Sequence, residues 1–137
     1  MKKLPYNIHD TINSGQVFLW QNQENIWFGI DGQNTIQISR KPSQTVILSK
    51  KARNFLRDDD DFSKIVKGIS KDKIVKKAIK HSPGLRITRQ DPFQCYISFI
   101  VSSNSNIPNI QTRLEKLCHT FGEKKMIQDK EFFLFPE

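Results

Sequence analysis

Cysteine is scarce in this sequence, and long apolar runs are absent from it. Two cysteines in 137 residues exclude the disulfide framework of a small secreted scaffold. The cysteines and the three histidines show neither C-x-x-C nor H-x-x-x-H spacing, so the sequence predicts no structural zinc site, no other metal and no cofactor. No stretch approaches the roughly 18 consecutive apolar residues of a membrane span, and no signal-peptide core follows Met1. We therefore expect a soluble intracellular protein that is not secreted and has no membrane partner.

The chain has fewer acidic than basic residues, and the imbalance comes from one segment. The chain carries 22 Lys+Arg against 14 Asp+Glu, a formal charge of +8. Residues 62–90 hold nine basic residues and one acid, Asp72, so this window alone contributes 9 − 1 = +8 and the rest of the chain balances. Basic charge concentrated on one segment is typical of a surface that binds a polyanion. A solvated lysine-rich helix face that only promotes solubility explains the same pattern.

Hydrophobic periodicity divides the chain near residue 50. Before that point, β-branched and aromatic runs alternate with turn residues, which predicts antiparallel strands at 16–21, 25–30, 35–39 and 45–48. Beyond it, the period becomes helical, and we expect helices at 52–56, 62–69, 73–80, 92–101 and 107–121. Strands followed by helices, without βαβ alternation, indicate an α+β fold.

The sequence also predicts where some of these helices begin and end, and which of their sides are buried. The run Asp58–Asp61 suits the start of a helix because negative charge is favourable there, although adjacent aspartates can also bind a cation. Ser82-Pro83-Gly84 should stop the lysine-rich helix, and Gly122 should cap the last one. The helix after Asp91-Pro92 is apolar on nearly every side, so it should be buried almost all round.

Two short segments could carry chemistry. Ser102–Asn106 places five small polar residues between two helices, where they could bond to base edges or form an ordinary capped turn. In Ser14–Trp20, Gly15 stands before an aromatic strand, where glycine lets the backbone approach a ligand closely or simply begins a strand.

Three segments together resemble the 8-oxoguanine DNA glycosylase family in order and spacing. They are SGQVFLW at 14–20, RQDPFQC to SSNSNI at 89–107, and RLEKLCHTFG at 113–122. The resemblance implies an N-terminal α+β domain at 1–88, with a twisted antiparallel β-sheet and flanking helices. At 89–137 it implies the incomplete start of an all-α helix-hairpin-helix glycosylase domain.

The resemblance also implies a function and site residues. Members of this family flip oxidised guanine out of duplex DNA, cleave its glycosidic bond with a lysine amine and nick the abasic strand. By position, the Gly15 carbonyl would accept the N7–H that distinguishes 8-oxoguanine, and Asn104 would fill the vacated space and contact the estranged cytosine. Asn109 stands where the family usually has an arginine that reads this cytosine. The basic charge of residues 62–90, and not the resemblance, makes Lys73, Lys76, Lys77 and Lys80 candidate phosphate contacts.

The catalytic segment of the family has no counterpart in these 137 residues. The family's lysine follows a hairpin of the L-P-G-V-G type, whereas the single P-G here, at Pro83-Gly84, precedes the resembling D-P-F helix. We therefore nominate none of the sixteen lysines as nucleophile and expect this chain, acting as a monomer, to recognise 8-oxoguanine in duplex DNA without excising it. The alternatives are a non-enzymatic basic nucleic-acid-binding module and a protein-interaction domain.

Overall fold

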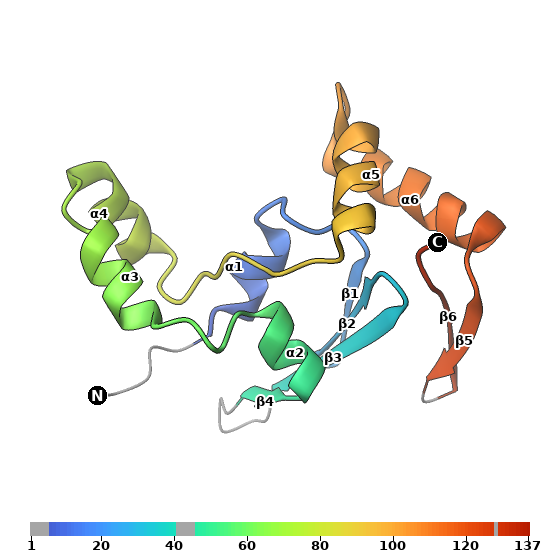
Figure 1. The fold of residues 1–137 in the computed structure, drawn as a ribbon, viewed down its shortest axis with the longest axis horizontal. Coiled ribbons are helices and arrows are strands. Elements are labelled where there is room, and N and C mark those ends of the chain that lie inside the picture. The colour runs from blue at the N-terminus through green and yellow to red at the C-terminus, as the bar shows by residue number, and fades with distance from the viewer. Residues whose placement is uncertain (1–5, 41–45, 128) are drawn as a thin grey trace.

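The computed structural model describes residues 6–40, 46–127 and 129–137 and has an α+β architecture (Figure 1). Its helices and strands, in chain order, are α1 (Ile8–Asn13), β1 (Trp20–Gln23), β2 (Ile26–Asp31), β3 (Asn34–Arg40), β4 (Val46–Leu48), α2 (Lys50–Phe55), α3 (Phe62–Ile69), α4 (Lys73–His81), α5 (Pro92–Ser102), α6 (Ile107–Phe121), β5 (Lys124–Ile127) and β6 (Lys130–Phe133).

The first four strands form the antiparallel meander that the sequence predicts, in the order β1-β2-β3-β4. Glu24 and Asn25 both have positive φ, at 48° and 71°, which matches the tight turn that two twisted strands require. Gly32, with φ of 57°, serves the next turn. The predicted turn at 41–44 lies outside the described residues.

The predicted strand at 16–21 is corrected, because β1 begins only at Trp20. Residues 17–20 do not alternate between a buried and an exposed face, since all four are buried. The reason is that this segment runs between two hydrophobic clusters and supplies side chains to both. The sheet core consists of Ile8, Ile12, Val17, Trp20, Ile36, Ile38, Ala52, Phe55 and Leu56. The helix core consists of Phe18, Leu19, Ile110, Leu114, Cys118 and Phe135.

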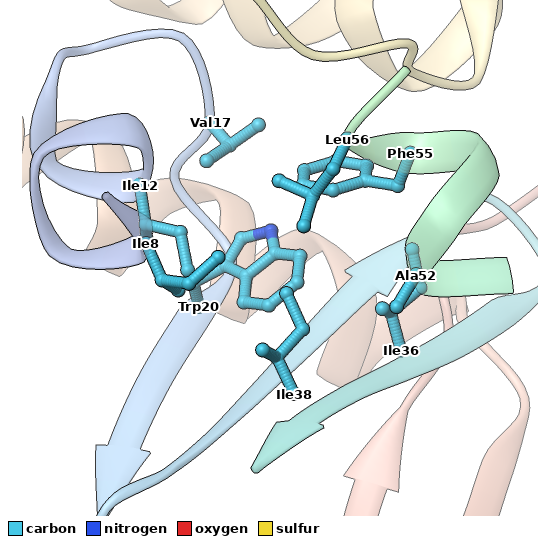
Figure 2. Close-up of a cluster of buried hydrophobic side chains, with 9 residues drawn as sticks. All are labelled: Ile8, Ile12, Val17, Trp20, Ile36, Ile38, Ala52, Phe55 and Leu56. Atoms are coloured by element: carbon cyan, nitrogen blue, oxygen red, sulfur yellow. The ribbon is translucent and has the colours of Figure 1, made fainter. Parts of the chain in front are cut away.

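Trp20 lies at the centre of the sheet core (Figure 2). Its ring packs against that of Phe55 from α2, with centroids 4.9 Å apart. It also covers the backbone of Gly29, its partner across β1 and β2, where a side chain would overlap the indole. The six-residue helix α1, whose Ile8 and Ile12 close the other side, was not predicted, because one and a half turns are too short to show a helical period.

Helices α3 and α4 form a pair that stands apart from the sheet in Figure 1. Neither contains a buried residue. Asp61 caps α3 as the sequence predicts, and α4 ends at His81, directly before Ser82-Pro83-Gly84. The other aspartates of the run pair with arginines, Asp60 with Arg57 at 2.7 Å, Asp59 with Arg89 at 3.1 Å and Asp58 with Arg53 at 3.6 Å. Within the described part of the chain, no group of three or more His, Cys, Asp or Glu is arranged to hold a metal ion.

The expectation that the helix after Asp91 is buried nearly all round is wrong. Its two buried side chains are the polar Gln94 and Ser98, whereas Phe93, Tyr96, Phe99 and Ile100 are 49–66% exposed. The physical reason is that one side of α5 packs on α6 and the sheet, and no element of residues 6–40, 46–127 or 129–137 covers the other sides. None of the helices in these ranges combines the length and the apolar character needed to cross a membrane.

A hairpin of β5 and β6 follows α6, and the sequence analysis did not predict it. After β6 the chain returns to the helix core, where Leu134 and Phe135 are buried. Gly122 caps α6 as predicted, but its role there is to allow close approach, because a Cβ would overlap the carbonyl oxygen of Leu134. The segment after α6 is therefore part of the fold.

Candidate functional site

The turn between α1 and β1 presents the backbone of Gly15. Its φ of +82° lies in the left-handed region that favours glycine. A Cβ built on Gly15 would meet nothing within 4 Å, so this side of the residue faces open space. The turn can therefore offer main-chain groups to a ligand without steric hindrance from a side chain.

Side chains next to Gly15 fasten this turn to the segment 86–88. The Gln16 amide donates to the carbonyl of Arg86 at 2.9 Å and accepts the N–H of Thr88 at 3.0 Å. The buried Thr11 hydroxyl accepts the N–H of Arg86 at 3.0 Å. Two segments about 70 residues apart in sequence are thus joined on both sides of Gly15, and sequence reasoning did not identify this linkage.

The polar turn between α5 and α6 presents Asn104, which is exposed and has a φ of 52°. The Asn106 side chain caps α6 by accepting the N–H of Asn109 at 3.0 Å. The side chain of Asn109 is exposed in the first turn of α6. The turn is thus a capped helix connection that also presents amide side chains to solvent, so the two interpretations of this segment are compatible.

Buried polar contacts tie the start of α5 to the sheet. Gln94, 5% exposed, donates to the carbonyl of Ile30 at 2.9 Å and accepts the N–H of Gly32 at 2.7 Å. The Asp31 carboxylate accepts the N–H of Asp91 at 2.6 Å. Burial raises the pKa of Asp31, and the nearby charge of Asp91 acts in the same direction, whereas the bond from the Asp91 N–H opposes it. A glutamine within an otherwise apolar helix was the sequence signal for this anchor.

In Figure 1 the turn between α5 and α6 lies at the top of the view, whereas the turn between α1 and β1 lies nearer its middle. Phe18, three residues after Gly15, packs edge-on against Phe99 of α5, with ring centroids 6.4 Å apart. This ring contact connects the segment that carries Gly15 with the helix that leads to Asn104.

The predicted lysines Lys73, Lys76, Lys77 and Lys80 are all exposed on α4. Two other members of the basic window are not free for a polyanion, which corrects the interpretation of residues 62–90 as one surface. Arg86 is 3% exposed, with its guanidinium between the rings of Tyr6 and Phe62, and burial lowers its pKa. Arg89 pairs with Asp59. In Figure 1, α4 lies at the opposite end of the molecule from α5 and α6.

The two thiols are not placed for nucleophilic chemistry. Cys118 is buried in the helix core, and burial raises its pKa to about 11, so it stays protonated at neutral pH. Cys95 is half-buried on α5. The arrangement as a whole suits recognition by backbone and amide groups.

Comparison with known proteins gives matches along the whole chain. A family model described as the 8-oxoguanine DNA glycosylase N-terminal domain matches residues 1–96. The N-glycosylase/DNA lyase OGG1 of Arabidopsis thaliana is 26% identical over 140 aligned residues, which cover 92% of this chain and 38% of that protein. The N-glycosylase/DNA lyase of Saccharomyces cerevisiae is 50% identical over 44 residues, 31% of this chain and 12% of that protein.

Solved structures share this fold. The structure of MBOgg1 in complex with a low-affinity DNA ligand matches this fold with a TM-score of 0.87 at 30% identity. The match covers 96% of this chain and 48% of the MBOgg1 chain. The 8-oxoguanine glycosylase/lyase of Clostridium acetobutylicum, bound to double-stranded DNA with cytosine opposite 8-oxoguanine, has a TM-score of 0.86 at 28% identity and the same coverage. The chain thus spans about half the length of these proteins, and less of the plant relative.

Proposed function

The chain belongs to the 8-oxoguanine DNA glycosylase family, and from this premise we propose that residues 1–137 provide the lesion-recognition part of a base-excision repair glycosylase/lyase. Its partner in this proposal is duplex DNA that contains 8-oxoguanine, bound by a monomer inside the cell. The observation that carries the proposal is the open, left-handed Gly15 turn, coupled through Phe18 and Phe99 to the exposed amide turn of Asn104.

Gly15 would identify the lesion through its carbonyl oxygen. 8-Oxoguanine carries an N–H at N7, where guanine carries a lone pair. A fixed carbonyl acceptor bonds to the oxidised base, whereas guanine would leave two acceptors facing each other, which costs the bond and its desolvation. The open side of Gly15 gives a flipped base room to approach the backbone.

Asn104 would occupy the space that the flipped base leaves and contact the estranged cytosine. An amide side chain offers both a donor and an acceptor to a base edge. Asn109 lies in the first turn of α6, five residues after Asn104. Its side chain is shorter than that of an arginine and uncharged, so its contact to the opposite base would be weaker. The four lysines of α4 would add a general, salt-dependent attraction to phosphates.

We also propose the domain organisation that the sequence suggests, an α+β domain at 1–88 and the beginning of a helix-hairpin-helix glycosylase domain at 89–137. The exposed apolar side chains of α5 and α6 support this proposal, since a further helical layer would cover them. The helix core joins the two stretches, so the boundary separates roles and not independently folding units.

The proposal predicts a measurable lesion preference. The chain should bind a duplex with 8-oxoguanine opposite cytosine more tightly than the undamaged duplex, with the two dissociation constants measured by fluorescence anisotropy. Gly15→Ala, which strains the turn, should reduce the ratio about tenfold, the equivalent of about one net hydrogen bond. Asn104→Ala should reduce affinity for the damaged duplex by a similar factor.

Matched controls are Gly68→Ala on α3 and Asn22→Ala on β1, both exposed and both outside the two turns. Neither should change the ratio. Equal affinity for both duplexes, with a steep salt dependence, would instead favour the non-enzymatic basic module. Dimerisation without DNA affinity would favour a protein-interaction domain.

We further propose that these 137 residues contain no catalytic residue, because no segment of the L-P-G-x-G type is present. A polypeptide of residues 1–137, incubated with the damaged duplex and borohydride, should give no covalent adduct, since trapping requires a lysine imine. The Clostridium acetobutylicum glycosylase/lyase serves as the positive control. A trapped adduct, mapped to a lysine by mass spectrometry, would refute this part of the proposal.

A further inference from the structure

The side chain of Gln16 closes a bridge across the turn that presents Gly15. Its amide nitrogen donates to the Ser14 hydroxyl and to the carbonyl of Arg86, both at 2.9 Å. Its amide oxygen accepts the N–H of Thr88 at 3.0 Å. One side chain thus uses both its donor and its acceptor capacity to join the residue before Gly15 to a segment about 70 residues away.

The segment that receives these bonds is itself held firmly. Arg86 and Thr88 are both buried. The N–H of Arg86 donates to the Thr11 hydroxyl of α1 at 3.0 Å, and the N–H of Arg89 donates to the carbonyl of Phe55 in α2 at 2.8 Å. Gln16 is therefore attached to a fixed frame that both helices support.

Gly15 has no comparable support of its own. It carries no side chain, and a Cβ there would touch nothing within 4 Å, so no side-chain packing of its own holds this residue. Glycine also loses more conformational freedom on ordering than any other residue. The orientation of its carbonyl depends on its neighbours, namely the Ser14 hydroxyl, which donates to the carbonyl of Thr11 at 2.8 Å, and Gln16.

We infer that Gln16 is a positioning residue, whose side-chain bridge to Arg86 and Thr88 sets the direction of the Gly15 carbonyl. The inference rests on the proposed role of Gly15 in recognising the oxidised base. A preorganised acceptor does not have to be ordered when the base arrives, so the bond to N7–H is formed at a lower entropic cost. Without the bridge, the chain would still bind DNA, but it would distinguish the two bases poorly.

The test compares Gln16→Leu with Gln21→Leu, an exposed glutamine on β1, by measuring the dissociation constants for damaged and undamaged duplexes. Gln16→Leu should reduce the lesion preference about five- to tenfold, while affinity for undamaged DNA and the circular dichroism spectrum stay unchanged. Gln21→Leu should change neither constant. An equal loss of affinity for both duplexes would show a merely structural role and overturn the inference.

A second variant, Gln16→Glu, tests the hydrogen bond that the Gln16 amide donates to the Arg86 carbonyl. It also provides a test if Gln16→Leu does not fold. In Gln16→Glu, the carboxylate can accept the N–H of Thr88 but cannot donate to the carbonyl of Arg86, whereas the protonated acid can do both. Its lesion preference, normalised to the wild-type chain at each pH, should be low at pH 8, where the carboxylate is ionised, and should rise only as the pH falls toward the ordinary glutamate pKa of about 4.3. A normalised preference that stays at the wild-type level at pH 8 would contradict the bridge.

The recognition role of Gly15 and the positioning role of Gln16 can be tested separately. If Gly15→Ala keeps the lesion preference, the proposed recognition role is wrong. If Gly15→Ala loses the preference while Gln16→Leu and Gln16→Glu keep it, the role of Gly15 stands and the positioning role of Gln16 falls.

Discussion

Replacing Phe135 with alanine is expected to lower the free energy of unfolding by about 3–5 kcal/mol, the usual cost of removing a buried phenyl ring. Phe135 is 1% exposed, lies in the helix core with Leu114 and Cys118, and packs edge-on against Phe93 at 6.0 Å. Its backbone bonds, from its N–H to the Gly32 carbonyl and from the Gln33 amide to its own carbonyl, would survive the change. The loss would therefore report the lost burial of the ring and the cavity that it leaves, without a contribution from these backbone bonds.

The matched control for this prediction is Phe121→Ala, which makes the same chemical change at a side chain that is 71% exposed. Denaturant titration, followed by circular dichroism, should give a midpoint close to that of the parent chain for Phe121→Ala and a much lower one for Phe135→Ala. Similar midpoints for the two variants would mean that the segment after α6 is not part of the folded core.

Replacing Gly29 with alanine is expected to destabilise the sheet core by about 3 kcal/mol, the upper end of the cost of overpacking. The new methyl would overlap the Trp20 indole, which is held by Phe55 on one side and lies among Ile8, Ile12 and Ile38. The side chains of Ile12, Ile38, Phe55 and Leu56 surround the Trp20 ring and restrict its movement (Figure 2). Tryptophan fluorescence during thermal unfolding would measure the effect.

Gly68→Ala supplies the contrast, because a Cβ at this position in α3 meets nothing within 4 Å. Alanine in a helix is favoured over glycine, so this variant should gain up to about 1 kcal/mol of stability. Opposite signs for the two Gly→Ala changes are the expected result. A stable Gly29→Ala chain with unchanged tryptophan emission would contradict the packing of this core.

The sequence predicted those parts of the fold in which a single local period decides the structure. The antiparallel strands and the helices from α2 to α6 follow from alternation, helical spacing and caps such as Asp91-Pro92 and Gly122. The errors arose where tertiary contacts decide. The segment 17–20 is buried on both sides because it lies between two cores, and no local pattern shows that. For the same reason, the apolar composition of α5 could not reveal which of its sides is covered.

In the candidate site, too, some residues were found from the sequence, whereas their supporting contacts were not. Gly15 and Asn104 were found through motifs that resemble a known family, and both have the positive φ that makes their turns distinctive. Gln16 stood in the same motif without a predicted role, because its partners at 86 and 88 are about 70 residues away. Single-sequence reasoning finds the residue types of such a site, but the contacts that hold them require the fold.

The division into two cores also determines which core can form first while the chain is synthesised. All nine residues of the sheet core lie within the first 56 residues, so a nascent chain of that length already contains every side chain that this cluster needs. The helix core begins with Phe18 and ends with Phe135, and its backbone contact between Gly32 and Phe135 spans about 100 residues. This long loop closure makes a large contribution to the contact order. One half of the Ser14–Trp20 motif can thus be packed early in synthesis, whereas Phe18 and Leu19 complete their cluster only after Phe135 has been made.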